Sequence, residues 1–292
     1  RHRIGSRHST MSWENPPVPH EVNASRESVL AEFLRLLAGL GICVLALAAL
    51  LYFAGGWLAR WVPISTEAAW VGDHVIGLPG LDDAPADAGN AHILAQLQAL
   101  TARVAVNMDL PQGMQVRVHL SSSDVPNAFA TLGGHLVVNR GLYRRMPSEN
   151  ALALVIAHEV GHIKARDPIA AVGGSASLAL LTVALGGDAR SLAPGIARLV
   201  QLGYSRQAES AADAEALLGL HRLYGHAGGA AAVFEVLDDY GREHREISMP
   251  TLLSTHPADA RRIQRMRDAA ADWNGNPPLV PLPVEEETGA RP

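Results

Sequence analysis

Cysteine and aromatic residues are scarce in this chain, and positive charge is not in excess. Cys43 is the single cysteine among 292 residues, so the chain has no disulfide framework and no zinc site built on thiolates. Aromatic residues make up 5% of the sequence, and the net charge of −5 gives no reason to expect a nucleic-acid partner. A bound metal would therefore need His, Asp and Glu ligands.

Apolar residues are plentiful, at 48% of the chain, and one long run of them has no charge. This run extends from Leu36 to Ala59, roughly 36 Å as a helix, which is enough to cross a bilayer. Arg35 and Arg60 bracket it, and aromatic residues gather at its far end: Tyr52, Trp57 and Trp61. We predict one transmembrane helix within residues 29–62. A buried core helix is the alternative, whereas a signal peptide has a shorter apolar region.

The charges on either side of this run predict its orientation. Arg26 and Arg35 precede it, whereas Asp73 and Asp82 follow it. The positive-inside rule then places the N-terminus in the cytoplasm and the rest of the chain outside. We expect a single-pass protein of a bacterial inner membrane, with its catalytic domain on the extracytoplasmic side.

Composition divides the rest of the chain. Residues 1–28 are predicted to be disordered, with residues 1–10 before Met11 set aside as upstream or added sequence. We expect a linker at 63–90, a domain at 91–273 and a flexible tail at 274–292. A second uncharged stretch, 169–187, is predicted to be a buried helix of the domain; the alternative is contact with the membrane.

Within the domain, hydrophobic periodicity predicts an α+β fold that is mostly helical, with a small antiparallel sheet. Residues 114–120 alternate as a strand does, and residues 127–130 and 135–139 read as two strands of a hairpin around Gly133-Gly134. A helix should begin after Ser148, a good N-cap, and end at Asp167-Pro168.

This helix contains the pattern H-E-x-x-H in His158, Glu159 and His162. Positions four apart share one helix face, so the two imidazoles can reach a single ion. Glu159 lies roughly 100° further round, where a general base belongs. Catalytic zinc normally has three protein ligands and an open position for water, so a third ligand should follow.

Glu209 is the candidate for this ligand. Glu209 and Asp213 are four residues apart among alanines, which suits one carboxylate on the metal and one that orients a ligating imidazole. Two acids on a solvated helix face are the alternative, which is favoured for the pair in isolation. The preceding H-E-x-x-H helix reverses that preference.

In these motifs the chain resembles the gluzincin peptidases, and more narrowly the family of HtpX and the CAAX prenyl endopeptidases. The resemblance covers about residues 91–270. It rests on four stretches in order: Asn127-Ala128-Phe129-Ala130, His158-Glu159-Val160-Gly161-His162, Glu209-Ser210-Ala211-Ala212-Asp213 and Ser254-Thr255-His256-Pro257.

The resemblance implies a zincin-like domain that holds one zinc ion through His158, His162 and Glu209, with Glu159 as the base and Asp213 behind a ligand. It implies that residues 127–130, Asn127, Ala128, Phe129 and Ala130, form an edge along which substrate lies. His256 would either stabilise the oxyanion or occupy the open zinc position. Arg262 would be structural. These families are multi-pass, whereas this chain has one convincing span, which disfavours prenylated substrates.

The sequence therefore predicts a membrane-anchored zinc endopeptidase that cuts misfolded or membrane-proximal proteins with a water activated by Glu159. We expect the substrate to add a strand to the 127–130 or the 135–139 edge. Three alternatives remain: a zinc-binding chaperone or adaptor that does not cut, a multi-pass CAAX-type peptidase, and an enzyme inhibited by its own His256 or His244.

Overall fold

The computed structural model describes residues 28–71, 88–184, 186, 204–244, 256 and 260–283. The predicted disordered N-terminus before residue 28, residues 72–87 of the predicted linker and residues 284–292 of the predicted tail lie outside the described residues. Residues 274–283 of that tail are not loose, because Val280 exchanges hydrogen bonds with Glu149 and Asn150. So do the neighbours of His256 in its motif. The chain divides into two compact units, Arg1–Leu47 and Ala48–Pro292. The described part of the first unit is the beginning of helix α1, and all other elements belong to the second.

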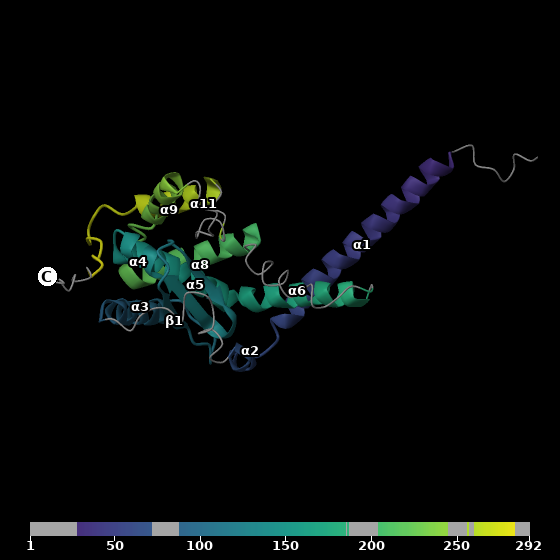
Figure 1. The fold of residues 1–292 in the computed structure, drawn as a ribbon. Helices are drawn as coiled ribbons and strands as arrows, with labels where there is room; N and C mark the ends of the chain where they lie inside the picture. Colours follow the sequence, from purple (N-terminus) through teal and green to yellow (C-terminus); the bar gives the residue numbers. More distant parts are fainter. Residues whose placement is uncertain are drawn as a thin grey trace, which may run out of the picture. The chain divides into compact units, whose positions relative to one another are not determined.

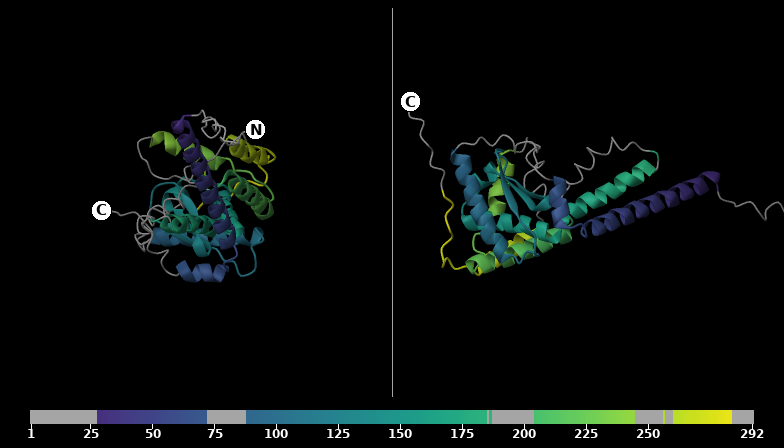
Figure 2. Two further views of the ribbon diagram at one scale, coloured as in Figure 1. Left: turned by 90° about the vertical axis from the view of Figure 1, so that its right-hand side faces the viewer. Right: turned by 90° about the horizontal axis from the view of Figure 1, so that it is seen from below.

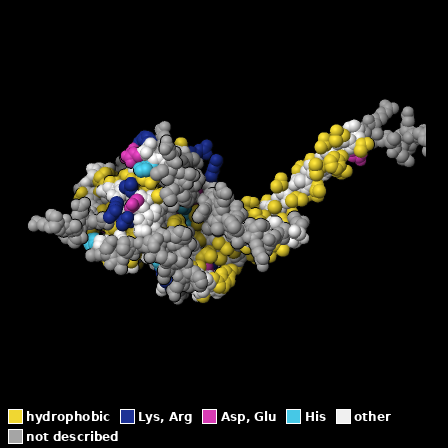
Figure 3. Space-filling model, in the orientation of Figure 1, with side chains coloured by type: hydrophobic (Ala, Val, Ile, Leu, Met, Phe, Trp, Pro, Cys, Tyr) yellow, Lys and Arg dark blue, Asp and Glu magenta, His cyan; other side chains and the backbone are white. Residues whose placement is uncertain are grey.

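The long apolar run forms helix α1, Val29–Ala59. Most of its large side chains are exposed, including Phe33, Leu45 and Phe53, and its one buried residue is Gly56. Figure 3 shows hydrophobic side chains along the visible face of this helix. Helices α1 and α6, Asp167–Ala184, are long and apolar enough to cross a membrane by length and composition. An apolar helix surface without protein cover favours a lipid environment for α1.

The predicted fold class is confirmed: the domain is mostly helical, with one small sheet among the described residues. Its strands are β1 (Arg117–Ser121), β2 (Ala128–Thr131) and β3 (His135–Asn139), in the order β1-β3-β2. Strands β2 and β3 form the predicted antiparallel hairpin, whereas β1 is parallel to β3. The sheet is therefore mixed, because the chain crosses from β1 to the far edge before it returns through the centre.

This order corrects one prediction. Residues 135–139 cannot offer an edge to a substrate, because β3 is the central strand and pairs on both sides. All five of its residues are buried. Among the described strands, β2 pairs on one side and is an edge.

Helices surround this sheet, and α3, α5 and α8 lie together with the strands in the views of Figures 1 and 2. The remaining described helices are α2 (Ile64–Val71), α3 (Ala88–Asn107), α4 (Arg140–Arg145), α5 (Glu149–Ala165), α8 (Arg206–Tyr224), α9 (Ala232–Glu243) and α11 (Ala260–Ala271). Every residue of α5 from Asn150 to Ile163 is buried. Helix α5 is therefore the centre of the domain, and the H-E-x-x-H motif lies within the core.

Both ends of α5 follow from local sequence. The hydroxyl of Ser148 accepts a hydrogen bond from the backbone N–H of Ala151 at 3.2 Å, as an N-cap does. The helix ends at Arg166, which adopts a left-handed conformation with φ of 62°. Asp167 and Pro168 then begin α6, where a proline is well tolerated in the first turn. This kink brings Asp167 back beside the last turn of α5.

Helix α6 agrees with its prediction in type but not in burial. Residues 167–184 form a helix, yet only 28% of its apolar window is buried. Leu180 and Val183 in its second half are exposed. The prediction of a buried helix is therefore wrong for that half, because α6 extends beyond the core.

Close packing of α5 and α8 places two distant segments at one point. A Cβ atom on Gly161 would lie 3.2 Å from the Cα of Ala212, so glycine allows the helix backbones to approach. Ala212 and Ala216 are buried between the helices. The small residues around Glu209 and Asp213 therefore serve this packing, and the two acids face α5.

Candidate active site

Helix α5 directs its motif side chains toward α8 and the edge strand. The Nε2 atoms of His158 and His162 lie 3.1 Å apart, so both imidazoles reach one point. Glu159 is wholly buried, and its Oε2 accepts a hydrogen bond from the backbone N–H of Ala130 at 2.8 Å. The candidate base, Glu159, is thus hydrogen-bonded to strand β2. The two imidazoles converge next to this carboxylate.

Helix α8 supplies the carboxylate predicted to be the third ligand. Its N-cap Ser205 accepts a hydrogen bond from Ala208, which sets the start of the helix one turn before Glu209. The two carboxylate oxygens of Glu209 lie 3.3 Å from Nε2 of His158 and 3.5 Å from Nε2 of His162. Glu209 is buried, which excludes the alternative of a solvated helix face.

The other nitrogen of each histidine faces its own carboxylate. Nδ1 of His158 lies 3.1 Å from Asp213, and Nδ1 of His162 lies 2.9 Å from Asp167. Since ionised carboxylates only accept, each Nδ1 must carry the hydrogen, and each Nε2 presents a lone pair to the shared point. Such carboxylate–histidine pairs are typical of zinc sites.

These distances fit a zinc ion. Tetrahedral zinc with bonds of about 2.0–2.1 Å to nitrogen places its ligand atoms about 3.3 Å apart. The two Nε2 atoms are 3.1 Å apart, and each lies near this distance from one oxygen of Glu209: His158 at 3.3 Å from Oε2 and His162 at 3.5 Å from Oε1. One ligand atom from each of these residues and from His256 lies within 4.8 Å of the others. Two converging imidazole lone pairs also require a positive charge between them.

The pKa of His158 also indicates that the site favours a positive charge. Burial lowers that pKa, but hydrogen bonds with Asp213 and Glu209 outweigh burial and raise it to about 9. The surrounding carboxylates therefore favour a positive charge at His158, which a proton or a divalent ion would supply, and metal binding is coupled to deprotonation.

Arg262 compensates the negative charge of the two α8 carboxylates. Its Nε and Nη2 donate to Asp213 at 2.7 and 2.8 Å, and its Nη1 lies 2.7 Å from Glu209. Burial raises the pKa of Asp213, but the bonds from Arg262 and His158 outweigh it and lower this pKa to about 2. The pKa of Glu209 is also lowered, because hydrogen bonds with His158 and His256 outweigh burial. Both acids stay ionised.

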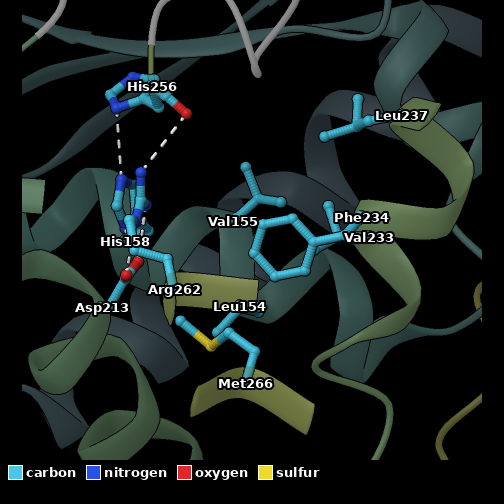
Figure 4. Close-up of a pocket in the computed structure, with 10 residues that line it drawn as sticks. All are labelled: Leu154, Val155, His158, Asp213, Val233, Phe234, Leu237, His256, Arg262 and Met266. Carbon is cyan, nitrogen blue, oxygen red and sulfur yellow. Dashed lines mark hydrogen bonds and ion pairs between the residues drawn. The ribbon is translucent and has the colours of Figure 1, made fainter. Parts of the chain in front are cut away.

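His256 lies across the open side of the site. Its Nδ1 is 2.9 Å from Glu209 and 3.3 Å from Nε2 of His158, and its Nε2 is 3.2 Å from Glu159. Figure 4 shows its ring above His158. His244, the other candidate for this position, instead contacts the carbonyl of Tyr240 at the end of α9 and is not in the cluster. The structure therefore brings His256, and not His244, to the fourth position.

An apolar pocket adjoins His158 and His256. Figure 4 shows side chains of α5, α9 and α11 around it. Its apolar lining consists of Leu154, Val155, Val233, Phe234, Leu237 and Met266. His158, Asp213, His256 and Arg262 form its polar wall. A pocket of this character suits an apolar side chain.

Two contacts in the site were not predicted from the sequence. Asp167 was interpreted only as a helix terminator, although it orients His162. Tyr204 stacks on His162, with ring centroids 4.1 Å apart. No spacing rule points to either residue, but an acid just past the metal helix is a signal that could have drawn attention to Asp167.

A model of peptidase family M48 matches residues 92–270. A protease HtpX homologue of Acidiphilium cryptum is 30% identical over 282 residues, which cover 79% of this chain and 95% of the relative. A protease HtpX homologue of Pyrococcus furiosus is 28% identical and is covered over 90% of its length. A putative beta-barrel assembly-enhancing protease of Vibrio cholerae is 31% identical over 172 residues, but this chain spans only 34% of that relative.

Proposed function

Because the chain belongs to peptidase family M48 and is a zinc metalloprotease, we propose that it is a membrane-anchored endopeptidase that cuts misfolded or membrane-proximal proteins. One observation carries this proposal. Two imidazole Nε2 atoms and the Glu209 carboxylate converge within bonding distance of one ion, and Glu159 lies between that point and the edge strand.

We assign His158, His162 and Glu209 as the ligands of one zinc ion per chain. When bound, zinc supplies a Lewis acid that polarises the scissile carbonyl and makes water a better nucleophile near neutral pH. Asp213 and Asp167 orient the two imidazoles, and Arg262 keeps Asp213 in place. Burial of all these groups keeps the ligand geometry rigid.

Glu159 is assigned as the general base. Its Oε2 is held by the N–H of Ala130, and its Oε1 lies 3.2 Å from Nε2 of His256. Once His256 moves aside, Oε1 accepts the proton of the attacking water and returns it to the leaving amine. A substrate that extends strand β2 would run beside this carboxylate. Main-chain pairing of this kind, along residues 127–130, tolerates many side chains and suits a protease of broad specificity.

The apolar helices support a proposal for the localisation. We propose that α1 anchors the chain in the inner membrane with the protease domain outside the cytoplasm, linked through residues 63–90. Helix α6 keeps the multi-pass alternative open, since it also has the length and composition of a span. Prenylated substrates have no support in the residues of the site.

The direct test uses the full chain in detergent and in spheroplasts. Purified protein should contain one zinc per chain and cut casein, and a chelator should stop the cleavage. Spheroplasts should cut casein supplied outside, because the domain faces that side. A zinc-loaded protein that leaves casein and other unfolded proteins intact would support a binding adaptor instead. Cleavage only in inverted vesicles would reverse the orientation.

His256 lies where a substrate carbonyl or water would enter, so we propose that it inhibits the enzyme. His256→Ala should raise basal casein cleavage, by about tenfold if the histidine fills the position in nine-tenths of the molecules. His244→Ala is the matched control and should have no effect, because His244 contacts only the end of α9 among the described residues. A fall in activity in His256→Ala would instead assign this residue to oxyanion stabilisation.

A further inference from the structure

The segment that follows α1, residues 60–71, contacts the active site at two points. The first contact is made by Arg60, whose Nη2 donates to Oδ1 of Asp167 at 2.9 Å. The opposite oxygen of Asp167 lies 2.9 Å from Nδ1 of His162. One carboxylate therefore connects the end of the apolar helix to an assigned zinc ligand.

The second contact is made by Glu67 on α2. Its side chain is buried, and Oε1 accepts a hydrogen bond from the backbone N–H of Gly133 at 2.8 Å. Its Oε2 lies 2.8 Å from Arg166, the residue that directly precedes Asp167. Gly133 belongs to the turn between β2 and β3, so Glu67 connects α2 to the strand whose Ala130 holds Glu159.

The packing of α1 against α6 places Arg60 near Asp167. A Cβ atom on Gly55 would lie 2.7 Å from the carbonyl oxygen of Gly173, and one on Gly174 would lie 2.8 Å from the ring of Tyr52. The end of α1 and the first half of α6 thus touch backbone to backbone, as glycine pairs allow. Asp167 begins α6, so its distance from Arg60 is set by this contact.

Helix α2 and the turn between β2 and β3 approach each other as closely. A Cβ atom on Gly133, which has a φ of 75°, would lie 2.9 Å from the Cα of Ala68. Helix α2 therefore packs directly on the β2–β3 turn, where Glu67 bonds to Gly133. The predicted linker begins with this helix, so its first residues are part of the domain core.

We propose that residues 60–71 are a positioning part of the active site, in which Arg60 orients His162 through Asp167 and Glu67 orients the β2–β3 turn. The part of this proposal that concerns Arg60 rests on the proposed function, because His162 is an assigned zinc ligand. An exposed ion pair is usually worth little. Arg60, however, pairs with a carboxylate that is 6% exposed, and the loss of outer partners of this kind typically lowers metal affinity by about 10–100-fold.

The test compares two arginine variants of the full chain in detergent. Arg60→Gln should lower zinc affinity by about tenfold, the low end of the range for outer partners, and should change the absorption spectrum of the cobalt-substituted protein. Arg60→Lys retains a donor and should recover most of the affinity. Arg103→Gln is the matched control: Arg103 is as exposed as Arg60, at 46%, and pairs with Glu149 away from the site. It should leave affinity and spectrum unchanged.

Glu67→Ala tests the second contact, because it removes the acceptor of the Gly133 N–H. It should raise KM for a peptide substrate while zinc affinity stays at the wild-type value, because the turn and not the ligand is disturbed. Glu67→Gln keeps an acceptor oxygen for Gly133 and should have a KM near that of the wild type. The proposal is overturned if Arg60→Gln binds zinc as the wild type does, if Arg103→Gln loses as much affinity, or if Glu67→Ala leaves KM unchanged. A wild-type chain that binds zinc but does not cut casein would overturn the proposed function alone, since zinc affinity is measured without cleavage.

Discussion

Glu159→Gln should abolish cleavage while the protein keeps its zinc. General acid–base catalysis contributes about 10²–10⁴-fold, so casein turnover should fall by that factor. The glutamine can still accept the N–H of Ala130, because its amide oxygen replaces Oε2. The fold and the ligand atoms of His158 and His162 should therefore remain, and zinc content measured by metal analysis should stay at one per chain.

The matched control is Glu149→Gln, on the same helix. Glu149 lies at the N-terminal end of α5, where it pairs with Arg103 and Tyr224. It should reduce stability slightly and leave turnover per folded molecule unchanged. Undiminished cleavage by Glu159→Gln would contradict the assignment of Glu159 as the base. Loss of zinc in that variant would show that Glu159 acts on the metal itself.

Glu209→Gln should remove zinc from the site. The variant loses the single anionic ligand and turns an amide toward Nε2 of His158 or His162, which lie 3.3 and 3.5 Å from the present oxygens. Zinc affinity should fall by more than the roughly 10–100-fold seen when an outer partner is lost. Competition with a chromophoric chelator measures this affinity directly, and cleavage should fall in parallel.

Glu215→Gln on the same helix is the control for this loss. Glu215 faces the surface and pairs with Lys164, so its substitution removes one negative charge from α8 without touching the site. It should bind zinc as the wild type does. If Glu209→Gln also bound zinc at wild-type affinity, Glu209 would not be a ligand, and the third protein donor would have to be His256.

Local sequence was sufficient wherever a role depends on neighbours along one helix. Ser148 and the Asp167-Pro168 pair predicted both ends of α5, and four-residue spacing placed His158 and His162 on one face. Glu209 and Asp213 are also four residues apart, but that spacing alone favours a solvated helix face, and only the preceding H-E-x-x-H helix points to a metal site. The hairpin around Gly133-Gly134 was predicted from its own residues, since turn chemistry is local.

Predictions were weaker wherever two distant segments meet. The parallel pairing of β1 with β3 depends on which strand the chain inserts between its neighbours, and no alternation pattern reveals that order. The exposure of the second half of α6 depends on where the core ends. An apolar run has the same composition whether it faces protein or lipid, so its burial could not be derived from composition.

The sequence by itself determined the chemistry of this protein: an apolar helix long enough for a bilayer, and a helix that carries two imidazoles and a base. It also determined that the metal would be held without cysteine. Only the tertiary structure decided which carboxylate orients which histidine, that His256 reaches the fourth position, and that Arg60 reaches Asp167. The physical reason is that Arg60 and Asp167 are 107 residues apart along the chain, and their contact depends on how α1 and α6 pack, at glycines that let the two backbones approach.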